Sequence, residues 1–198
     1  GERAWHALPF IGTMNVPHSI LAWDVLVLNW YLALNLFIAV YMSCHTYFGK
    51  TPNKYFIVPL ILLSIPSAVG IHTVTAFVYN GLAARPFWNA SILAPRFLAS
   101  AFCSGPALMI LIFQVMRKTL NVKIEDRAIL KLAEIIVYAM AINLFLLLAE
   151  VFKEYHSGTI HLASMKYLFQ GLHGHSGLVP WIWTAILFNT TAFLLFLF

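Results

Sequence analysis

The sequence predicts an all-α fold, a polytopic transmembrane helix bundle. Hydrophobic residues make up 61% of its 198 residues and charged residues only 10%, whereas a soluble domain carries about 25% charged residues. Five apolar stretches are each long enough to cross a bilayer as a helix of about 20 residues. A membrane β-barrel is not expected, because it would show alternating stretches of about 10 residues.

The first three spans follow a polar lead-in over residues 1–17. The first is expected over 18–47, in the run SILAWDVLVLNWYLALNLFIAVYMSC. The second covers 54–80 and the third covers 94–117. Both contain prolines and glycines, which would break soluble helices but are tolerated inside membrane bundles, often beside a cavity.

The last two spans complete a single transmembrane domain over 1–198. The fourth is expected over 127–153, after a loop rich in lysine and arginine. The fifth covers 177–198 and is apolar to its end. Because the chain begins without a methionine and stops inside this apolar run, we expect it to be a fragment of a longer membrane protein.

Basic residues predict the orientation of these spans, since cytoplasmic loops are enriched in lysine and arginine. Seven of them flank the first and third connections: Lys50, Lys54, Arg117, Lys118, Lys123, Arg127 and Lys131. These two connections are therefore expected in the cytoplasm of a cell (inner) membrane, and the lead-in and the other two connections outside. The basic residues thus report topology, and the net charge of +5 does not indicate a nucleic-acid partner.

Ionisable side chains gather in the outer third of the predicted bundle. Asp24 lies about two turns into the first span, His72 about two turns from the end of the second, and Arg96 opens the third. Glu150 and Glu154 lie near the outer end of the fourth. An arginine at the centre of a membrane helix costs about 2.5–3.5 kcal/mol on insertion scales. Helical spacing places these groups on polar stripes that should face one another.

Such a constellation suits a quinone headgroup, which has two carbonyls and moves protons together with electrons. The predicted quinone-binding residues are Asp24, His72 and Arg96. Imidazole titrates near neutral pH in solution, a carboxylate can carry a proton onward, and a guanidinium can polarise a carbonyl. Glu134, Asn143 and Glu150 are the predicted proton path toward the cytoplasm.

Each of these residues also has a structural interpretation. Asp24 and Arg96 can form an ion pair, and His72 can bond to a backbone carbonyl. Glu150 and Glu154 can be solvated charges at a helix end. Glu134 can pair with Lys131 or Arg127.

We expect neither a metal site nor haem. Haem ligation needs histidines that face one another across helices, and only His72 lies well inside a span. A metal site formed by His173 and His175 with His156 and His161 in the last loop is a weak alternative, and we expect this loop to dock a partner protein instead. Cys44 and Cys103 form no zinc-binding pattern and are expected to be packing residues.

The chain resembles a known family at three stretches: ILAWDVLVLNWYLALNL, GIHTVTAFVYNGLAARPFW and PRFLASAFCSGPALMIL. These are similar to the membrane subunits of polysulfide reductase (NrfD/PsrC-like), with the DsrP/HmcC-type subunits of sulfur-metabolising complexes as the nearest resemblance. The resemblance implies eight to ten spans, of which this chain would hold roughly the fourth to eighth. It matches Asp24 to an acidic position early in the fourth span, and it places His72 and Arg96 in the fifth and sixth.

The resemblance also implies a function. Members bind menaquinone or menaquinol without a redox cofactor of their own. They exchange electrons with a ferredoxin-like iron–sulfur subunit on the outer face, alongside other membrane subunits and a multihaem cytochrome c. The chain would then be one subunit of a quinol-linked oxidoreductase complex.

Two other classes remain open at this stage. A secondary transporter or channel could line its path with the same polar residues, although transporters usually show two corresponding broken helices in repeated halves and no repeat is visible here. A purely structural membrane anchor could use the polar residues to join helices.

Overall fold

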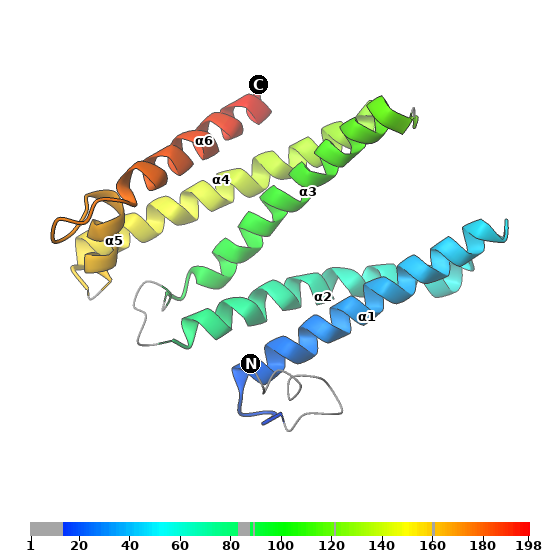
Figure 1. Ribbon diagram of the computed structural model, residues 1–198, viewed down its shortest axis with the longest axis horizontal. Coiled ribbons are helices and arrows are strands. Elements are labelled where there is room, and N and C mark those ends of the chain that lie inside the picture. Colours follow the sequence, from blue (N-terminus) through cyan, green and yellow to red (C-terminus); the bar gives the residue numbers. More distant parts are fainter. Residues whose placement is uncertain (1–13, 83–87, 89, 121, 160) are drawn as a thin grey trace. The chain divides into compact units, whose positions relative to one another are not determined.

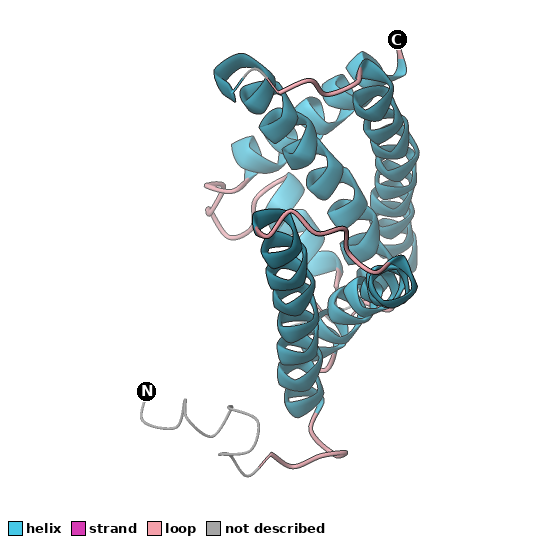
Figure 2. Cartoon of the chain, turned by 90° about the vertical axis from the view of Figure 1, so that its right-hand side faces the viewer, coloured by secondary structure: helices cyan, strands magenta, loops and turns pink. Residues whose placement is uncertain are grey.

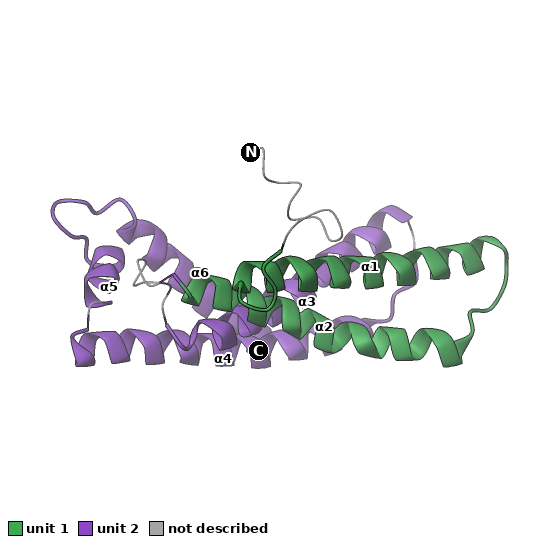
Figure 3. Ribbon diagram, turned by 90° about the horizontal axis from the view of Figure 1, so that it is seen from below, with its two compact units in different colours: residues 1–81 green, residues 82–198 purple. Residues whose placement is uncertain are grey.

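The structure, a computed structural model, describes residues 14–82, 88, 90–120, 122–159 and 161–198, and six helices account for most of this described part. The described part contains no strand, only an isolated bridge between Leu172 and His175 (Figure 2). Most of the predicted lead-in, residues 1–13, lies outside the described residues. The helices divide into two compact units, residues 1–81 and 82–198 (Figure 3).

The first unit is an antiparallel pair of long helices, α1 (Ile20–Tyr47) and α2 (Lys54–Asn80) (Figure 1). Both begin at a polar cap, because Ser19 Oγ accepts from the Ala22 amide at 3.3 Å and Asn53 Oδ1 from the Tyr55 amide at 3.1 Å. Such caps satisfy amides that have no partner within the helix. Pro59 and Pro66 lie inside α2.

Small residues and a few polar contacts hold α1 against α2. Ala22 and Ala76 are buried, and side chains of this size let membrane helices approach closely. Midway along the pair, Trp30 Nε1 donates to Ser67 Oγ at 3.2 Å. These contacts fix the register that determines which polar residues meet.

The second unit contains α3 (Leu93–Leu120), α4 (Asp126–Ser157), the short α5 (Leu162–Phe169) and α6 (Val179–Leu197). The central helix is α4, which packs against α3, α5 and α6. Its buried apolar residues are Ile136, Ala139 and Met140. Arg117 closes the turn between α3 and α4, because its guanidinium bonds to Asp126 Oδ1 at 2.6 Å and to the Ile124 carbonyl.

Five helices, all except α5, are long and apolar enough to cross a membrane. Their large hydrophobic side chains are mostly exposed, as expected where lipid is the solvent. Five helices match the five predicted spans, with ends that agree within four residues. The sequence prediction missed α5, whose 8 residues are too short for a span.

Candidate functional site

In the first unit, the polar site joins Asp24 of α1 to Thr75 of α2. Thr75 Oγ1 donates a hydrogen bond of 2.6 Å to Asp24 Oδ1, within the range typical of a hydroxyl on a carboxylate. Asp24 lies in the second turn of α1, and Thr75 lies five residues before the end of α2. Antiparallel packing brings these two positions to the same level. Both residues are half-buried.

His72 lies on the same stripe of α2, three residues before Thr75, and is half-buried. Residues three apart on a helix are neighbours on its surface. No carbonyl among the described residues accepts a hydrogen bond from His72. The structural interpretation of this histidine, a bond to a backbone carbonyl, is therefore not seen in the described part.

In the second unit, Arg96 of α3 forms an ion pair with Glu150 of α4. The Glu150 side chain is only 5% exposed and that of Arg96 is 27% exposed. Arg96 lies in the first turn of α3, and Glu150 lies seven residues before the end of α4. A carboxylate at this depth is stable only with a close partner, and the guanidinium supplies it.

Glu154 is a second buried carboxylate, one turn beyond Glu150 and 2% exposed. Thr159 Oγ1 donates to its Oε2, and Lys153 Nζ lies 3.3 Å from its Oε1. The alternative in which Glu150 and Glu154 are solvated helix-end charges is therefore wrong. The helix continues to Ser157 and turns only at Gly158, so both carboxylates lie inside the packed unit.

The two remaining residues of the predicted proton path lie farther along α4. Glu134 is exposed and its Oε2 lies 2.5 Å from Lys131 Nζ, so its alternative interpretation as an ion pair is confirmed. Asn143 is half-buried and shares the face of Glu150, since seven residues correspond to about two turns. Glu134 lies about 160° around the helix from Glu150 at about 100° per residue. Whether a proton passes along these three residues stays a prediction.

Among the residues that the structure describes, no three histidine, cysteine, aspartate or glutamate side chains lie close enough together to hold a metal ion. In the same part of the chain, Cys44 and Cys103 are free cysteines. His173 and His175 lie in the turn between α5 and α6, and both are exposed.

The predicted quinone site draws on both units, with Asp24 and His72 in the first and Arg96 in the second. Each unit supplies a specific partner that the prediction did not name for that role. Thr75 was not among the predicted site residues, and Glu150 was assigned to the proton path and not to Arg96. The meeting of Asp24, His72 and Arg96 around one headgroup stays a prediction.

Comparison with known proteins identifies the family. The profile of the family described as "Polysulphide reductase, NrfD" matches residues 1–197. A curated relative, one of the subunits of the selenate reductase of Mesobacillus selenatarsenatis, is 25% identical over 181 residues, which cover 75% of this chain and 41% of the relative. The chain thus spans about two fifths of the length of that relative. No solved structure matches. The chain therefore belongs to the polysulphide reductase NrfD family and is a multi-pass membrane protein.

Proposed function

We propose that the chain is the quinone- and quinol-binding part of a membrane subunit in a respiratory oxidoreductase complex of the cell membrane. The observation that carries this proposal is the pairing of ionisable side chains inside apolar spans. Asp24 has Thr75 as its donor and Glu150 has Arg96. The family match and the likeness to a selenate reductase subunit support the same function.

Oxidation of a quinol releases two protons and two electrons and leaves the quinone. In the proposed site, the Asp24 carboxylate accepts one proton while the Thr75 hydroxyl fixes its orientation. The His72 imidazole exchanges the other proton, and the Arg96 guanidinium stabilises negative charge on the headgroup oxygen. Quinone reduction follows the same steps in reverse, so the site serves either direction of electron flow.

The electrons pass to a partner, because neither carboxylates nor imidazoles carry them. We propose a ferredoxin-like iron–sulfur subunit on the outer face as that partner, in a complex with further membrane subunits and a multihaem cytochrome c. The alternating direction of the spans supports the placement of Asp24, His72 and Arg96 near the same side of the membrane. Successive spans alternate across a membrane, so the start of α1, the end of α2, the start of α3 and the end of α4 would face one side.

The proposed proton path leads from Glu150 through Asn143 to Glu134. Seven residues separate Glu150 from Asn143, a rise of about 10 Å along α4. Glu134 lies nine residues farther and on the opposite face. These side chains lie too far apart to hydrogen-bond to one another directly. The path therefore requires bridging water, which membrane cavities commonly hold.

Replacement of Asp24 tests the proposal. Asp24→Asn keeps the shape and removes the proton acceptor, so quinol-linked electron transfer should fall by tenfold or more, about 1.4 kcal/mol of barrier. Turnover is measured with the full-length protein in its complex, with a soluble artificial acceptor. Amounts of assembled complex are measured in parallel by native electrophoresis.

The matched control is Glu125→Gln, which removes a carboxylate that is exposed and makes no capping hydrogen bond. It should leave turnover unchanged. Normal turnover in Asp24→Asn would remove Asp24 from the site. Loss of assembly in step with activity would indicate a structural anchor.

A further inference from the structure

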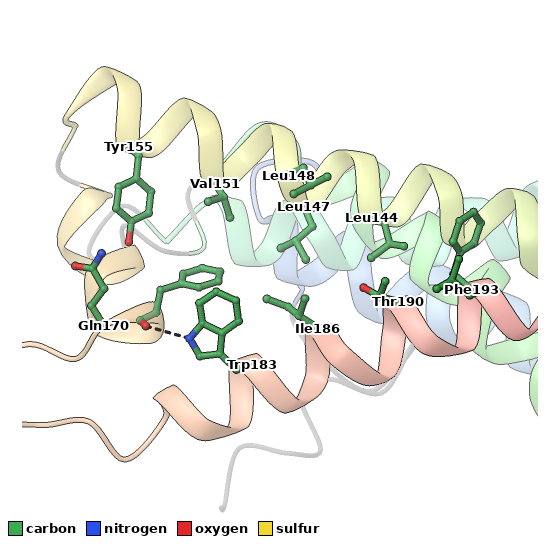
Figure 4. Close-up of a pocket in the computed structure, with 12 residues that line it drawn as sticks. Leu144, Leu147, Leu148, Val151, Tyr155, Gln170, Trp183, Ile186, Thr190 and Phe193 are labelled. Carbon is green, nitrogen blue, oxygen red and sulfur yellow. Dashed lines mark hydrogen bonds between the residues drawn. The ribbon is translucent and has the colours of Figure 1, made fainter.

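A pocket of about 600 Å³ lies within the second unit, between α4, α5 and α6 (Figure 4). This volume falls inside the range of about 300–1,000 Å³ typical of small-molecule sites. Its walls are two helical stripes, from Leu144 to Tyr155 on α4 and from Trp183 to Leu194 on α6, with Phe169 and Gln170 at one end. None of these residues belongs to the site proposed above.

Polar groups mark one end of this pocket. Figure 4 shows Tyr155, Gln170 and Trp183 at the end formed by α5, and the rest of the lining is apolar except for the Thr190 hydroxyl. Trp183 Nε1 is already occupied, because it donates to the Phe169 carbonyl at 3.3 Å. The Tyr155 hydroxyl and the Gln170 amide make no hydrogen bond within the described residues. They remain available to a ligand.

The shape of the pocket follows from its two walls. On α4 the lining runs from Leu144 to Tyr155, about 16 Å at 1.5 Å per residue. The facing stripe on α6 runs from Trp183 to Leu194. A slot between two helices accommodates one hydrocarbon chain more readily than the two chains of a phospholipid.

The charge of the lining also selects among ligands. No lysine, arginine, aspartate or glutamate lines the pocket, so nothing there compensates a charged headgroup. Phe169 and Trp183 pack edge to face, with ring centroids 5.8 Å apart, beside the two available polar groups. A neutral, flat head with hydrogen-bond acceptors and a single long chain matches each of these features.

We propose that this pocket binds an isoprenoid quinone or quinol at a second position, separate from Asp24, His72 and Arg96. The headgroup lies at the α5 end, where Tyr155 and Gln170 donate to its carbonyl oxygens. The isoprenoid chain lies along the leucine-rich stripe of α4 and the facing stripe of α6. This inference takes its ligand class from the proposed function, and its test is separate.

Photolabelling tests the proposal on the full-length protein in nanodiscs, with an azido-substituted isoprenoid quinone as the probe. Labelled peptides are identified by mass spectrometry. We expect label on peptides that contain Tyr155 or Gln170. Leu147→Trp fills the pocket and should reduce this label at least fivefold.

Matched variants separate the pocket from general effects on the helices. Leu187→Trp places the same bulk on the exposed surface of α6, outside the pocket, and should leave the label unchanged. Gln170→Leu removes a headgroup partner at an exposed position and should also reduce the label. Gln114→Leu, on an exposed residue of α3, should not. Gln170→Leu keeps the test decisive if Leu147→Trp does not fold.

Three results would overturn the inference: label that Leu147→Trp and Gln170→Leu do not reduce, label confined to peptides of residues 14–81, or displacement by excess phosphatidylglycerol but not by unlabelled quinone. The last result would assign the pocket to a phospholipid. Failure here does not touch the proposed function, which depends on turnover in Asp24→Asn.

Discussion

Glu150 and Glu154 illustrate how an acidic side chain can be kept inside an apolar helix. As whole residues they are 4% and 2% exposed. Each has its own partner, Arg96 for Glu150 and Thr159 for Glu154. A buried carboxylate without a partner would be strongly destabilising, because desolvation of the charge exceeds what nearby dipoles return. These contacts therefore stabilise the second unit relative to the same carboxylates without partners.

Arg96→Leu tests this at the residue scale. It leaves the Glu150 carboxylate buried and unpaired, and should lower the free energy of unfolding by about 2–3 kcal/mol, below the upper range for fully buried pairs because Arg96 is partly exposed. The measurement is equilibrium unfolding in mixed detergent and dodecyl sulfate micelles.

Two further variants serve as comparisons for Arg96→Leu. Arg96→Leu combined with Glu150→Leu should be less destabilising than Arg96→Leu alone, because no charge is left behind. Lys131→Leu breaks the exposed pair with Glu134 and should cause no measurable change, since such pairs contribute little. Equal losses in Arg96→Leu and Lys131→Leu would contradict the stabilising role of the buried pair.

The sequence identified most of these residues but not their partners. Depth along a span points to Asp24, Arg96 and Glu150, because ionisable groups are rare in apolar helices. Thr75 is harder to predict, since a threonine hydroxyl in a helix often bonds to its own backbone, as Thr73 does to the Val69 carbonyl at 2.8 Å. The choice of Glu150 by Arg96 depends on the packing of α3 against α4, which periodicity does not determine.

At the scale of the elements, the end of α4 is set by one glycine. Gly158 adopts a left-handed conformation, with φ of 60°, and its amide donates to the Glu154 carbonyl at 3.2 Å. A side chain at this position would meet no atom within 4 Å, so only the backbone conformation disfavours it.

Gly158→Ala should therefore lower the free energy of unfolding by about 1 kcal/mol. The control is Gly177→Ala, which also has open space around it but no positive φ. It should be neutral in the same unfolding assay. Similar losses in both variants would show that side-chain volume, and not the left-handed conformation, matters at Gly158.

The spans themselves were predictable because length and hydropathy determine them. The second was placed over 54–80, where the structure has Lys54–Asn80. The fourth was ended at 153, four residues before the end of α4 at Ser157. The pocket between α4 and α6 was not predicted, since its lining reads as ordinary apolar sequence until α5 closes one end.

At the scale of the whole molecule, the five spans must take one of two orientations. The distribution of lysine and arginine predicts that the connections α1–α2 and α3–α4 face the cytoplasm. Single cysteines test this in the full-length protein after Cys44 and Cys103 are replaced by serine. Ser176→Cys places a cysteine in an exposed turn before α6, and Lys123→Cys places one in the exposed connection between α3 and α4.

A maleimide that cannot cross membranes should label Ser176→Cys in intact spheroplasts. Lys123→Cys should react only after the membrane is permeabilised. The reverse pattern would invert the orientation, and it would contradict the proposed placement of an iron–sulfur partner on the outer face.

Two neighbouring faces of α4 serve different contacts: the Arg96–Glu150 ion pair on one and the apolar pocket on the other. The helix thus lies between the ion pair and the apolar pocket. A ligand that displaces α4 on entering the pocket would also change the geometry of the ion pair. By thermodynamic reciprocity, breaking that ion pair would then alter the affinity of the pocket for its ligand.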